Sequence, residues 1–429
     1  MKTLLDKIRS VFTDSVLRRR ILITLGILIV FRLLSVIPIP GIDTARLAGL
    51  FSGNQFLGLL NIFSGGSLAR LSIVMLGVGP YITASIIMQL MTILSPRLKA
   101  IYQEEGQAGR MRYAQYSRML TVPLALIQAF SFLTLLERQG IIDPLATFDL
   151  LRNVLIITAG SVFLMWLGER ISEFGIGNGT SLIIFAGIIA ALPLQISQYI
   201  FTNIYPTFDP SILPSLIVII IGSIIVTYAV VVITEAERPI PVTYAKRVRG
   251  NKVYGGVSTY LPLRLNQAGV IPIIFALSIL LFPQIIFRFF ERFNNATVNS
   301  ISEFVIKYTD PTSLSYGIIY FILIFAFTYF YTAVTFDPNT ISTNLQKNGA
   351  FIPGVRPGQS TAIHISRILT RLTAFGALFL AIIAILPLVV QAVLKNGSLV
   401  IGGTALLIVV SVVVDLIKKT EAQLSMKEY

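Results

Sequence analysis

Few residues of this chain are placed where they could do chemistry. Among its 429 residues there is no cysteine and a single histidine, His364, which excludes disulfides, thiolate metal sites and histidine-rich metal sites. No HExxH, GxSxG or paired acids within an apolar segment occur. We therefore expect no catalytic residue, no metal and no cofactor, and an intramembrane enzyme is not indicated.

Two ionisable residues lie inside long apolar segments, Arg32 and Asp415, the latter near the end of its segment. A charge at the centre of a membrane helix costs roughly 2.5–3.5 kcal/mol on insertion scales, so such residues are usually functional. Neither is a mid-membrane carboxylate of the kind a proton- or sodium-coupled transporter needs. The glycine-rich loop 175–181 lacks a GxxxxGK[ST] phosphate-binding pattern, so it is interpreted as a turn with Thr180 or Ser181 capping the next helix.

The composition indicates a membrane protein. Hydrophobic residues make up 55% of the chain and charged residues 13%, about half the charged fraction of an ordinary soluble domain. A helix crosses the bilayer core with about 20 apolar residues. Ten segments meet this requirement, and they are 21–37, 71–94, 120–136, 154–168, 181–199, 212–234, 268–287, 314–336, 372–394 and 399–417.

The basic residues orient these spans. With residues 1–20 inside, the cytoplasmic segments hold 25 of the 34 Lys and Arg residues, the outer segments hold 8, and Arg32 lies within the first span. Such an excess on short inner loops is the positive-inside pattern. Both termini are then cytoplasmic, and the net charge of +14 belongs to the cytoplasmic face, where it favours anionic lipid or a docked partner. Nucleic acid is expected there only within a partner such as a ribosome.

The spans divide into an N-terminal half, 21–204, and a C-terminal half, 212–417, followed by a cytoplasmic tail, 418–429. Because each half has five spans, duplicated halves would have to be inverted. The segment 56–70 is apolar but too short to cross and is broken at 64–67, so it is either a packing hairpin or a mobile piece in a central cavity.

Two cytoplasmic loops, 235–264 and 337–371, are longer than packing requires. Three glycines and two prolines in 349–358 stiffen the second loop around Arg356. A rigidly presented arginine suits recognition of a partner surface, and the alternative is a solvated loop in which Arg356 has no role.

At this point the sequence resembles a known family, the SecY protein-translocation channels. Nine stretches occur in the family's order. They are 29–32 with 37–41, then 61–66, 80–87, 163–169, 175–179, 244–247, 266–272, 349–358 and 402–409.

The resemblance implies an all-α polytopic membrane protein with ten transmembrane helices in two inverted five-helix halves around a central pore. By matching motifs, a ring of apolar side chains forms the constriction, at Val78, Ile82, Thr180, Ile184, Ile274 and Ile408. Thr180 departs from the ring's usual apolar character. Within 56–70, the plug that closes the outer funnel includes Asn61, Phe63, Ser64, Gly65 and Gly66. The residues that line a lateral gate to lipid are Gln89, Gln128 and Asn266.

The resemblance also implies partners. Lys246, Arg247 and Arg356 resemble the docking surface for a SecA-type ATPase motor or a ribosome, and SecE-like and SecG-like membrane subunits are expected beside the channel. The expected function is passage of unfolded secretory polypeptides across a bacterial plasma (inner) membrane, with sideways release of hydrophobic segments. The rival hypothesis, which topology alone would allow, is a secondary transporter with inverted repeats.

Overall fold

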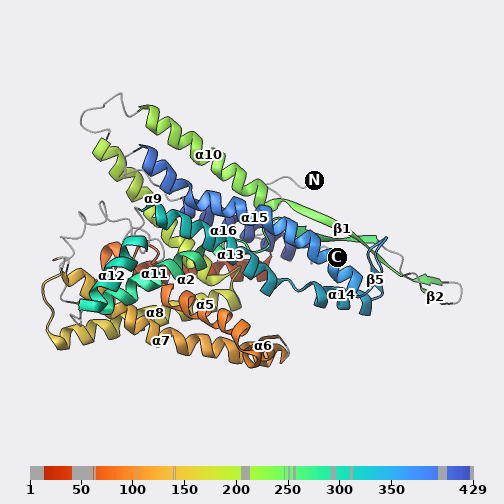
Figure 1. Cartoon of the computed structure of the whole chain (residues 1–429), viewed down its shortest axis with the longest axis horizontal. Helices are drawn as coiled ribbons and strands as arrows, with labels where there is room; N and C mark the ends of the chain where they lie inside the picture. Colours follow the sequence, from red (N-terminus) through yellow and green to blue (C-terminus); the bar gives the residue numbers. More distant parts are fainter. Residues whose placement is uncertain are drawn as a thin grey trace.

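The structure is a computed structural model, and it describes residues 14–40, 61, 64–103, 105–138, 140, 142–203, 213–245, 247–249, 252–254, 258–290, 296–309, 313–394 and 403–425. Each of the ten predicted spans overlaps a helix of the bundle in Figure 1. These helices are α2 (Ser15–Leu34), α5 (Gly79–Leu94), α7 (Gly106–Arg138), α8 (Thr147–Phe174), α9 (Gly179–Asn203), α10 (Leu213–Glu235), α11 (Ile271–Phe290), α13 (Leu314–Thr335), α15 (Gln359–Leu394) and α16 (Gly403–Ser425). The expected boundary between the halves, at 204–212, lies outside the described residues.

Length and composition alone show that several helices can cross a bilayer. Within the described part of the chain, four long apolar segments qualify, and they are Gly106–Glu137, Thr147–Phe174, Leu314–Lys347 and Gln359–Leu386. Shorter apolar stretches lie at Gly179–Pro193, Ile220–Glu235 and Ile271–Leu280. The chain is therefore a helical membrane protein, as its composition predicts.

The second span begins later than the apolar pattern predicts. Residues 71–78 form successive turns, and α5 starts at Gly79 with Pro80 in its first turn. Leu71 and Gly77 both have positive φ, at 42° and 59°, which an α-helix does not allow. Proline is well tolerated in a first helical turn because the N–H it lacks has no partner there. The apolar residues 71–78 are therefore part of the apolar segment but not of the helix, and the backbone conformation at these turns determines where α5 begins.

In the described part of the chain, three further α-helices lie outside the predicted spans: α6 (Pro96–Gln103), α12 (Ala296–Thr309) and α14 (Pro338–Lys347). Asp337 caps α14, because its carboxylate accepts a hydrogen bond from the Asn339 backbone N–H at 3.0 Å. A short 3₁₀ turn, η1 (Leu68–Arg70), precedes the turns that lead into α5.

The two long loops fold into β structure. A three-stranded antiparallel sheet has the order β4-β1-β5, built from β1 (Glu237–Tyr244), β4 (Ser258–Arg264) and β5 (Ala350–Phe351). A separate hairpin pairs β2 (Arg247–Arg249) with β3 (Lys252–Tyr254), and it projects from one end of the molecule in Figure 1.

The described residues contain two apolar cores. The larger lies within the helix bundle, and the smaller is formed by Ile240, Val242, Leu263, Ala350, Ile352 and Ile365. The smaller core joins residues from both long loops and from the start of α15. We call this body, made of β1, β4, β5, α14 and the first turns of α15, the sheet unit.

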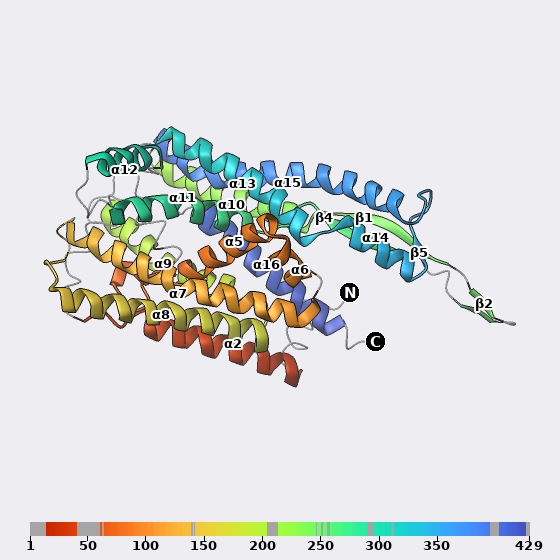
Figure 2. The ribbon, with the colours of Figure 1, turned by 60° about the horizontal axis from the view of Figure 1, so that its bottom comes forward.

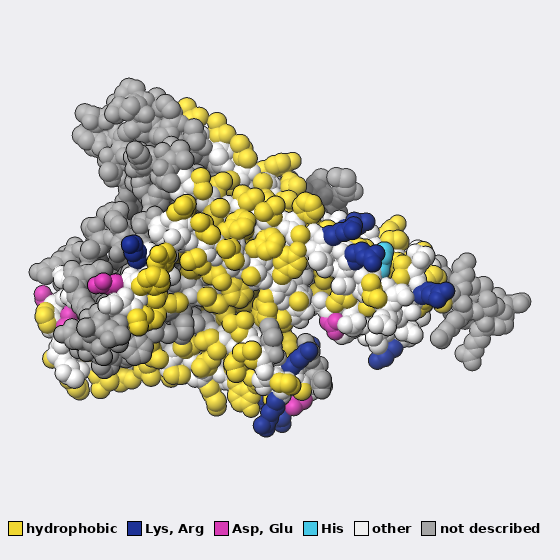
Figure 3. Space-filling model, viewed as in Figure 1, with side chains coloured by type: hydrophobic (Ala, Val, Ile, Leu, Met, Phe, Trp, Pro, Cys, Tyr) yellow, Lys and Arg dark blue, Asp and Glu magenta, His cyan; other side chains and the backbone are white. Residues whose placement is uncertain are grey.

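The sheet unit lies at one end of the bundle and α12 at the other, and Figure 2 shows both ends from a second direction. In Figure 3, hydrophobic side chains cover the middle of the visible face, while Lys and Arg gather mostly toward the sheet unit. An apolar middle with a basic end is the distribution that the charge count along the sequence predicts.

Candidate pore, plug and docking surface

Five of the six residues expected at the constriction belong to the core of the bundle. Val78 is the N-cap residue of α5, and Ile82 follows one turn later. Ile184 lies on α9, Ile274 at the start of α11 and Ile408 on α16. All five are buried members of one continuous apolar cluster. Among the helices that carry them, α5 packs against α11, and α9 packs against α16. Four helices drawn from both expected halves thus contribute these residues to the apolar core of the bundle.

Thr180 has a different environment. It lies in the first turn of α9, where its hydroxyl donates to the Asn178 side chain at 2.6 Å. The Thr180 methyl group faces α8, since a Cβ on Gly168 would lie 3.3 Å from it. The cap of α9 is Asn178, whose side-chain oxygen also accepts from the N–H groups of Thr180 and Ser181. The expectation that Thr180 or Ser181 would cap this helix is therefore wrong, because Asn178 precedes both and reaches their amides first.

The described part of the expected plug, Asn61 and residues 64–70, is held together by hydrogen bonds between residues close in sequence, and we call it the knot. The Asn61 side chain accepts from the Ala69 backbone N–H at 3.0 Å, and the Asn61 carbonyl accepts from Ser64 Oγ at 3.0 Å. Ser64 Oγ in turn accepts from the Leu68 N–H at 3.0 Å. Ser67 is buried and donates to the Ser64 carbonyl at 2.6 Å. The irregular backbone can therefore lie at membrane depth, because its polar groups are satisfied from within. Phe63 lies outside the described residues.

Two helices hold this knot in place. A Cβ on Gly65 would lie 2.6 Å from the Phe31 ring of α2 and 3.3 Å from the Gly187 Cα of α9. Gly66 faces α9 as well, with the Gly187 carbonyl 3.7 Å from its would-be Cβ. The absence of side chains at 65, 66 and 187 allows the backbones to touch.

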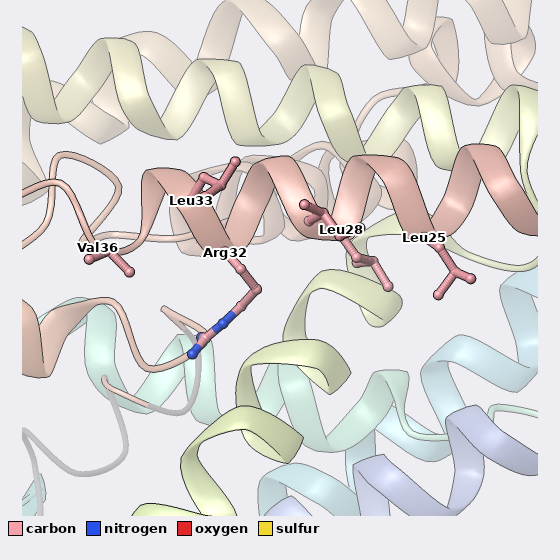
Figure 4. A pocket seen from close by; sticks show the side chains of 6 residues that line it. Leu25, Leu28, Arg32, Leu33 and Val36 are labelled. Atoms are coloured by element: carbon pink, nitrogen blue, oxygen red, sulfur yellow. The ribbon is translucent and has the colours of Figure 1, made fainter.

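Arg32 provides the charged contact between α2 and the knot. Its guanidinium donates to the Gly65 carbonyl at 3.4 Å. Figure 4 shows the Arg32 side chain leaving α2 toward the neighbouring loop, beside a shallow groove lined by α2 side chains. The groove residues are Leu25, Leu28, Ile29, Arg32, Leu33 and Val36. The sequence singled out Arg32 as an ionisable residue within a span, and the structure supplies its partner.

The turns between the knot and α5 are anchored to α8. Ser161 is fully buried, and its hydroxyl donates to the Gly77 carbonyl at 2.9 Å. A Cβ on Gly160 would overlap the Ile73 carbonyl, so these turns lie directly on α8. The Ile73 N–H donates to the Ile37 carbonyl at 3.0 Å, which ties the same turns to the end of α2. The approach to Val78 is thus held by both α8 and the end of α2.

The three expected gate residues lie on elements that pack together. Gln89 is on α5, the buried Gln128 is on α7, and the buried Asn266 lies in the connection between β4 and α11. The helices α5, α7 and α11 contact one another pairwise. Two of them make local hydrogen bonds: Gln89 donates to Ser85 at 3.5 Å, and Asn266 donates to the Gly269 carbonyl at 3.2 Å. The buried side-chain oxygens of Gln89 and Asn266 have no hydrogen-bond partner within the described residues.

Arg356 is exposed on the connection between β5 and α15. Gly349, Gly354 and Gly358 around it have φ of 67°, 81° and 95°, conformations that favour glycine. The Arg356 carbonyl accepts from Thr361 Oγ1 at 2.9 Å, and the Ser342 hydroxyl of α14 donates to the Gly358 carbonyl. The loop is therefore rigid, as the glycines and prolines predict. Arg247 lies on β2, and Lys246 lies outside the described residues.

The comparisons with known proteins decide the family. A family model described as SecY matches residues 72–417. The chain belongs to the SecY family. It is 41% identical over 432 residues to a protein translocase subunit SecY of Mycobacterium bovis, covering 96% of each chain. It is 42% identical to the SecY subunit of Halalkalibacterium halodurans, covering 98% of each chain.

Solved structures show the same SecY-type fold. A structure described as a protein-conducting channel superposes with a TM-score of 0.65 at 21% identity, over 95% of this chain and 92% of that one. Sec61 in the canine ribosome–channel complex superposes with a TM-score of 0.62 at 20% identity, over the same shares. At such identities the likeness concerns the fold, which is that of a SecY-family channel with ten membrane helices.

Sequence reasoning missed the residues that hold the knot. Gly187 and Ser161 lie inside apolar helices, where a glycine or serine has no motif to mark it. The available signal was physical: a glycine in the middle of a long helix is costly unless another backbone approaches it closely. The sequence also missed the sheet unit, whose strands alternate buried and exposed residues only over short runs.

Proposed function

We propose that this chain is the central protein-conducting channel of a Sec translocon. It passes unfolded secretory polypeptides across the membrane and releases hydrophobic segments sideways into lipid. One observation carries the proposal: Val78, Ile82, Ile184, Ile274 and Ile408 come from four helices and share one buried apolar cluster. Family membership favours this function over the secondary transporter that topology alone would allow.

The five side chains form the constriction ring, with Thr180 one turn away from Ile184 on the α8 side. A narrow apolar constriction loses its water, so ions meet a high barrier there. Aliphatic side chains can still contact a passing polypeptide of any sequence, because dispersion contacts need no specific partner. The ring can therefore exclude ions and still accept unrelated substrates.

The plug segment, residues 56–70, closes the channel from outside. Its support includes the Arg32–Gly65 hydrogen bond and the contact between Gly65 and Gly187. A hydrogen bond to a charged group contributes about 1.5–3 kcal/mol. Such a contact holds the closed state at rest and is weak enough to break when a polypeptide enters.

The gate is the seam between α11 and the pair α5 and α7. Each unsatisfied buried oxygen, on Gln89 and on Asn266, costs about 1–3 kcal/mol in the closed state. Opening the seam gives these oxygens access to water or to the N–H groups of a substrate. The unsatisfied side-chain oxygens of Gln89 and Asn266 thereby lower the free energy needed to open the gate.

The sheet unit and the neighbouring β2–β3 hairpin are the docking site for a driving partner, with Arg356 on the connection between β5 and α15 and Arg247 on β2. Lys246 precedes Arg247 in the sequence. The channel is not an enzyme, and a SecA-type ATPase motor or a translating ribosome supplies the energy. The likeness to Sec61 in a ribosome–channel complex supports the ribosome. SecE-like and SecG-like membrane subunits and anionic lipids complete the assembly.

The proposed location is a bacterial plasma (inner) membrane, with both termini and the sheet unit in the cytoplasm. The excess of Lys and Arg in the inner segments supports this orientation. Within it, 21–204 and 212–417 act as the two halves, and 1–20 and 418–429 as cytoplasmic ends.

Cysteine crosslinking to a stalled precursor tests the pore. The chain has no cysteine, so Ile82→Cys and Ile274→Cys each introduce a unique site. Both are expected to crosslink to a cysteine within the stalled precursor. Ile318→Cys on the exposed face of α13 is the matched control and is expected to react only with lipid-soluble probes. Reaction of Ile82→Cys and Ile274→Cys with lipid probes alone would refute the pore.

A further inference from the structure

The helix α12 lies in the expected outer loop 288–313 and has three distinct sides. One side is buried: Ser302 is inaccessible, and its hydroxyl donates to the Phe287 carbonyl of α11 at 3.4 Å. A second side is apolar yet exposed, with Ile301 at 49%, Phe304 at 62% and Tyr308 at 44%. The third side carries Glu303 and Lys307, both exposed.

The exposed apolar side is a continuous stripe. Positions 301, 304 and 308 are spaced i, i+3 and i+7, so at about 100° per residue they fall within roughly 60° of one another. The rings of Phe304 and Tyr308 lie together, with centroids 4.7 Å apart. Glu303 and Lys307 are spaced i, i+4 and lie on a separate strip of the same helix. An outer loop surrounded by water has no reason to segregate its residues in this way.

The helix α12 lies beside a candidate membrane-spanning helix whose exposed side is also apolar. The helix α12 packs on both α11 and α13. On α13, one of the segments long and apolar enough to cross a membrane, Leu314, Ile318 and Ile322 are exposed at i, i+4 and i+8. Figures 1 and 2 both place α12 at the end of the bundle opposite β2, beside the ends of α11 and α13. The exposed apolar side of α12 thus lies beside a helix that is apolar enough to cross a membrane and that also exposes apolar side chains.

We propose that α12 contacts the outer leaflet of the membrane through Ile301, Phe304 and Tyr308. Glu303 and Lys307 remain in water or among the lipid head groups. An amphipathic helix with aromatic and aliphatic residues on one side and charges on another is typical of the boundary between head groups and acyl chains. Because Ser302 ties α12 to α11, this contact attaches the outer end of a gate helix to the lipid.

Fluorescence quenching in proteoliposomes tests the contact. Trp166 is the chain's single tryptophan, so a Trp166→Phe background makes each new tryptophan a unique reporter. Phe304→Trp and the matched control Glu303→Trp are reconstituted as full chains into phosphatidylethanolamine–phosphatidylglycerol vesicles, with and without brominated acyl chains. We expect Phe304→Trp to be quenched at least about twofold more than Glu303→Trp, and to a degree similar to Ile318→Trp on α13.

Two results would overturn the proposal. Equal quenching of Phe304→Trp and Glu303→Trp, with red-shifted emission, would place the stripe in water. Blue-shifted emission without quenching would show that another protein surface or a second copy covers it. Cysteine labelling gives an answer that is independent of Trp166: a membrane-impermeant maleimide should modify Glu303→Cys at least about fivefold faster than Phe304→Cys, and equal rates would contradict lipid contact.

Discussion

Gly187 of α9 lies against Gly65 of the plug segment with no room for a methyl group between them. A Cβ on Gly187 would overlap the Gly65 Cα, and a Cβ on Gly65 would also meet the Phe31 ring. Two backbones touch at this point, one from a helix of the bundle and one from the irregular segment. The contact is thus sensitive to the smallest possible substitution.

Gly187→Ala is expected to displace the plug segment and make resting channels leak ions. The added methyl group cannot be accommodated by a rotamer change, because it meets backbone atoms. The measurement is resting conductance of the full chain in planar bilayers. Gly26→Ala is the control, since a Cβ on Gly26 of α2 meets no atom within 4 Å.

Deleting residues 56–70 should produce a leak at least as large as that of Gly187→Ala. If Gly187→Ala leaks and the deletion does not, the alanine acts through distortion of α9 and not through the plug. If neither variant changes resting conductance, the plug assignment is wrong.

Arg356→Glu is expected to abolish motor-driven export while membrane insertion of the chain and its fold stay intact. Arg356 is exposed on a rigid loop, so the substitution removes a cation without disturbing a core. The measurement is uptake of a precursor into vesicles with a SecA-type motor and ATP. Arg356→Lys keeps the charge but loses the planar fork of donors, and intermediate export by it would indicate that the geometry matters too. Normal export by Arg356→Glu would contradict the assignment of Arg356 to the docking surface.

Ile365→Ala is expected to destabilise the sheet unit by about 2–5 kcal/mol, the usual effect of deleting a buried isoleucine side chain down to alanine. Ile365 is fully buried in the small core, whereas Ile363 on the same helix is 54% exposed. Limited proteolysis should cut the β1–β4 region faster in Ile365→Ala and leave Ile363→Ala unchanged. Equal cleavage of the two variants would mean that the two loops do not depend on a shared core.

Gln89→Leu is expected to favour the closed gate. The substitution removes a buried unsatisfied oxygen and a weak bond to Ser85, so the closed seam gains up to about 1–3 kcal/mol. The measurement is the fraction of marginally hydrophobic segments that leave sideways into lipid, which should fall. Met88→Leu, a volume-conserving change on the same helix, serves as control. A rise in lateral release would contradict the gate assignment.

The sequence predicted much of the bundle because apolar length is a strong signal: each of the ten spans overlaps a helix. It placed the start of α5 too early, since the turns at 71–78 are as apolar as the helix that follows. It also missed β1 and β4, which pair within one loop but alternate buried and exposed residues only over a short run. It missed β5 because its partner β1 lies in the other loop, far away in the chain. Contacts such as Arg32–Gly65 depend on three-dimensional proximity, which spacing along a chain does not encode.

The strand β5 comes from one loop and β1 from the other, and their register joins Thr243 to Phe351 and Tyr244 to Ala350. The Ala245 N–H donates to the Gly349 carbonyl at 2.9 Å, which adds a further bond between the same loops. A chimera that grafts only one of these loops from a relative would pair a foreign strand with a native one. A successful graft will have to exchange both loops together, because each supplies a strand that pairs with a strand of the other.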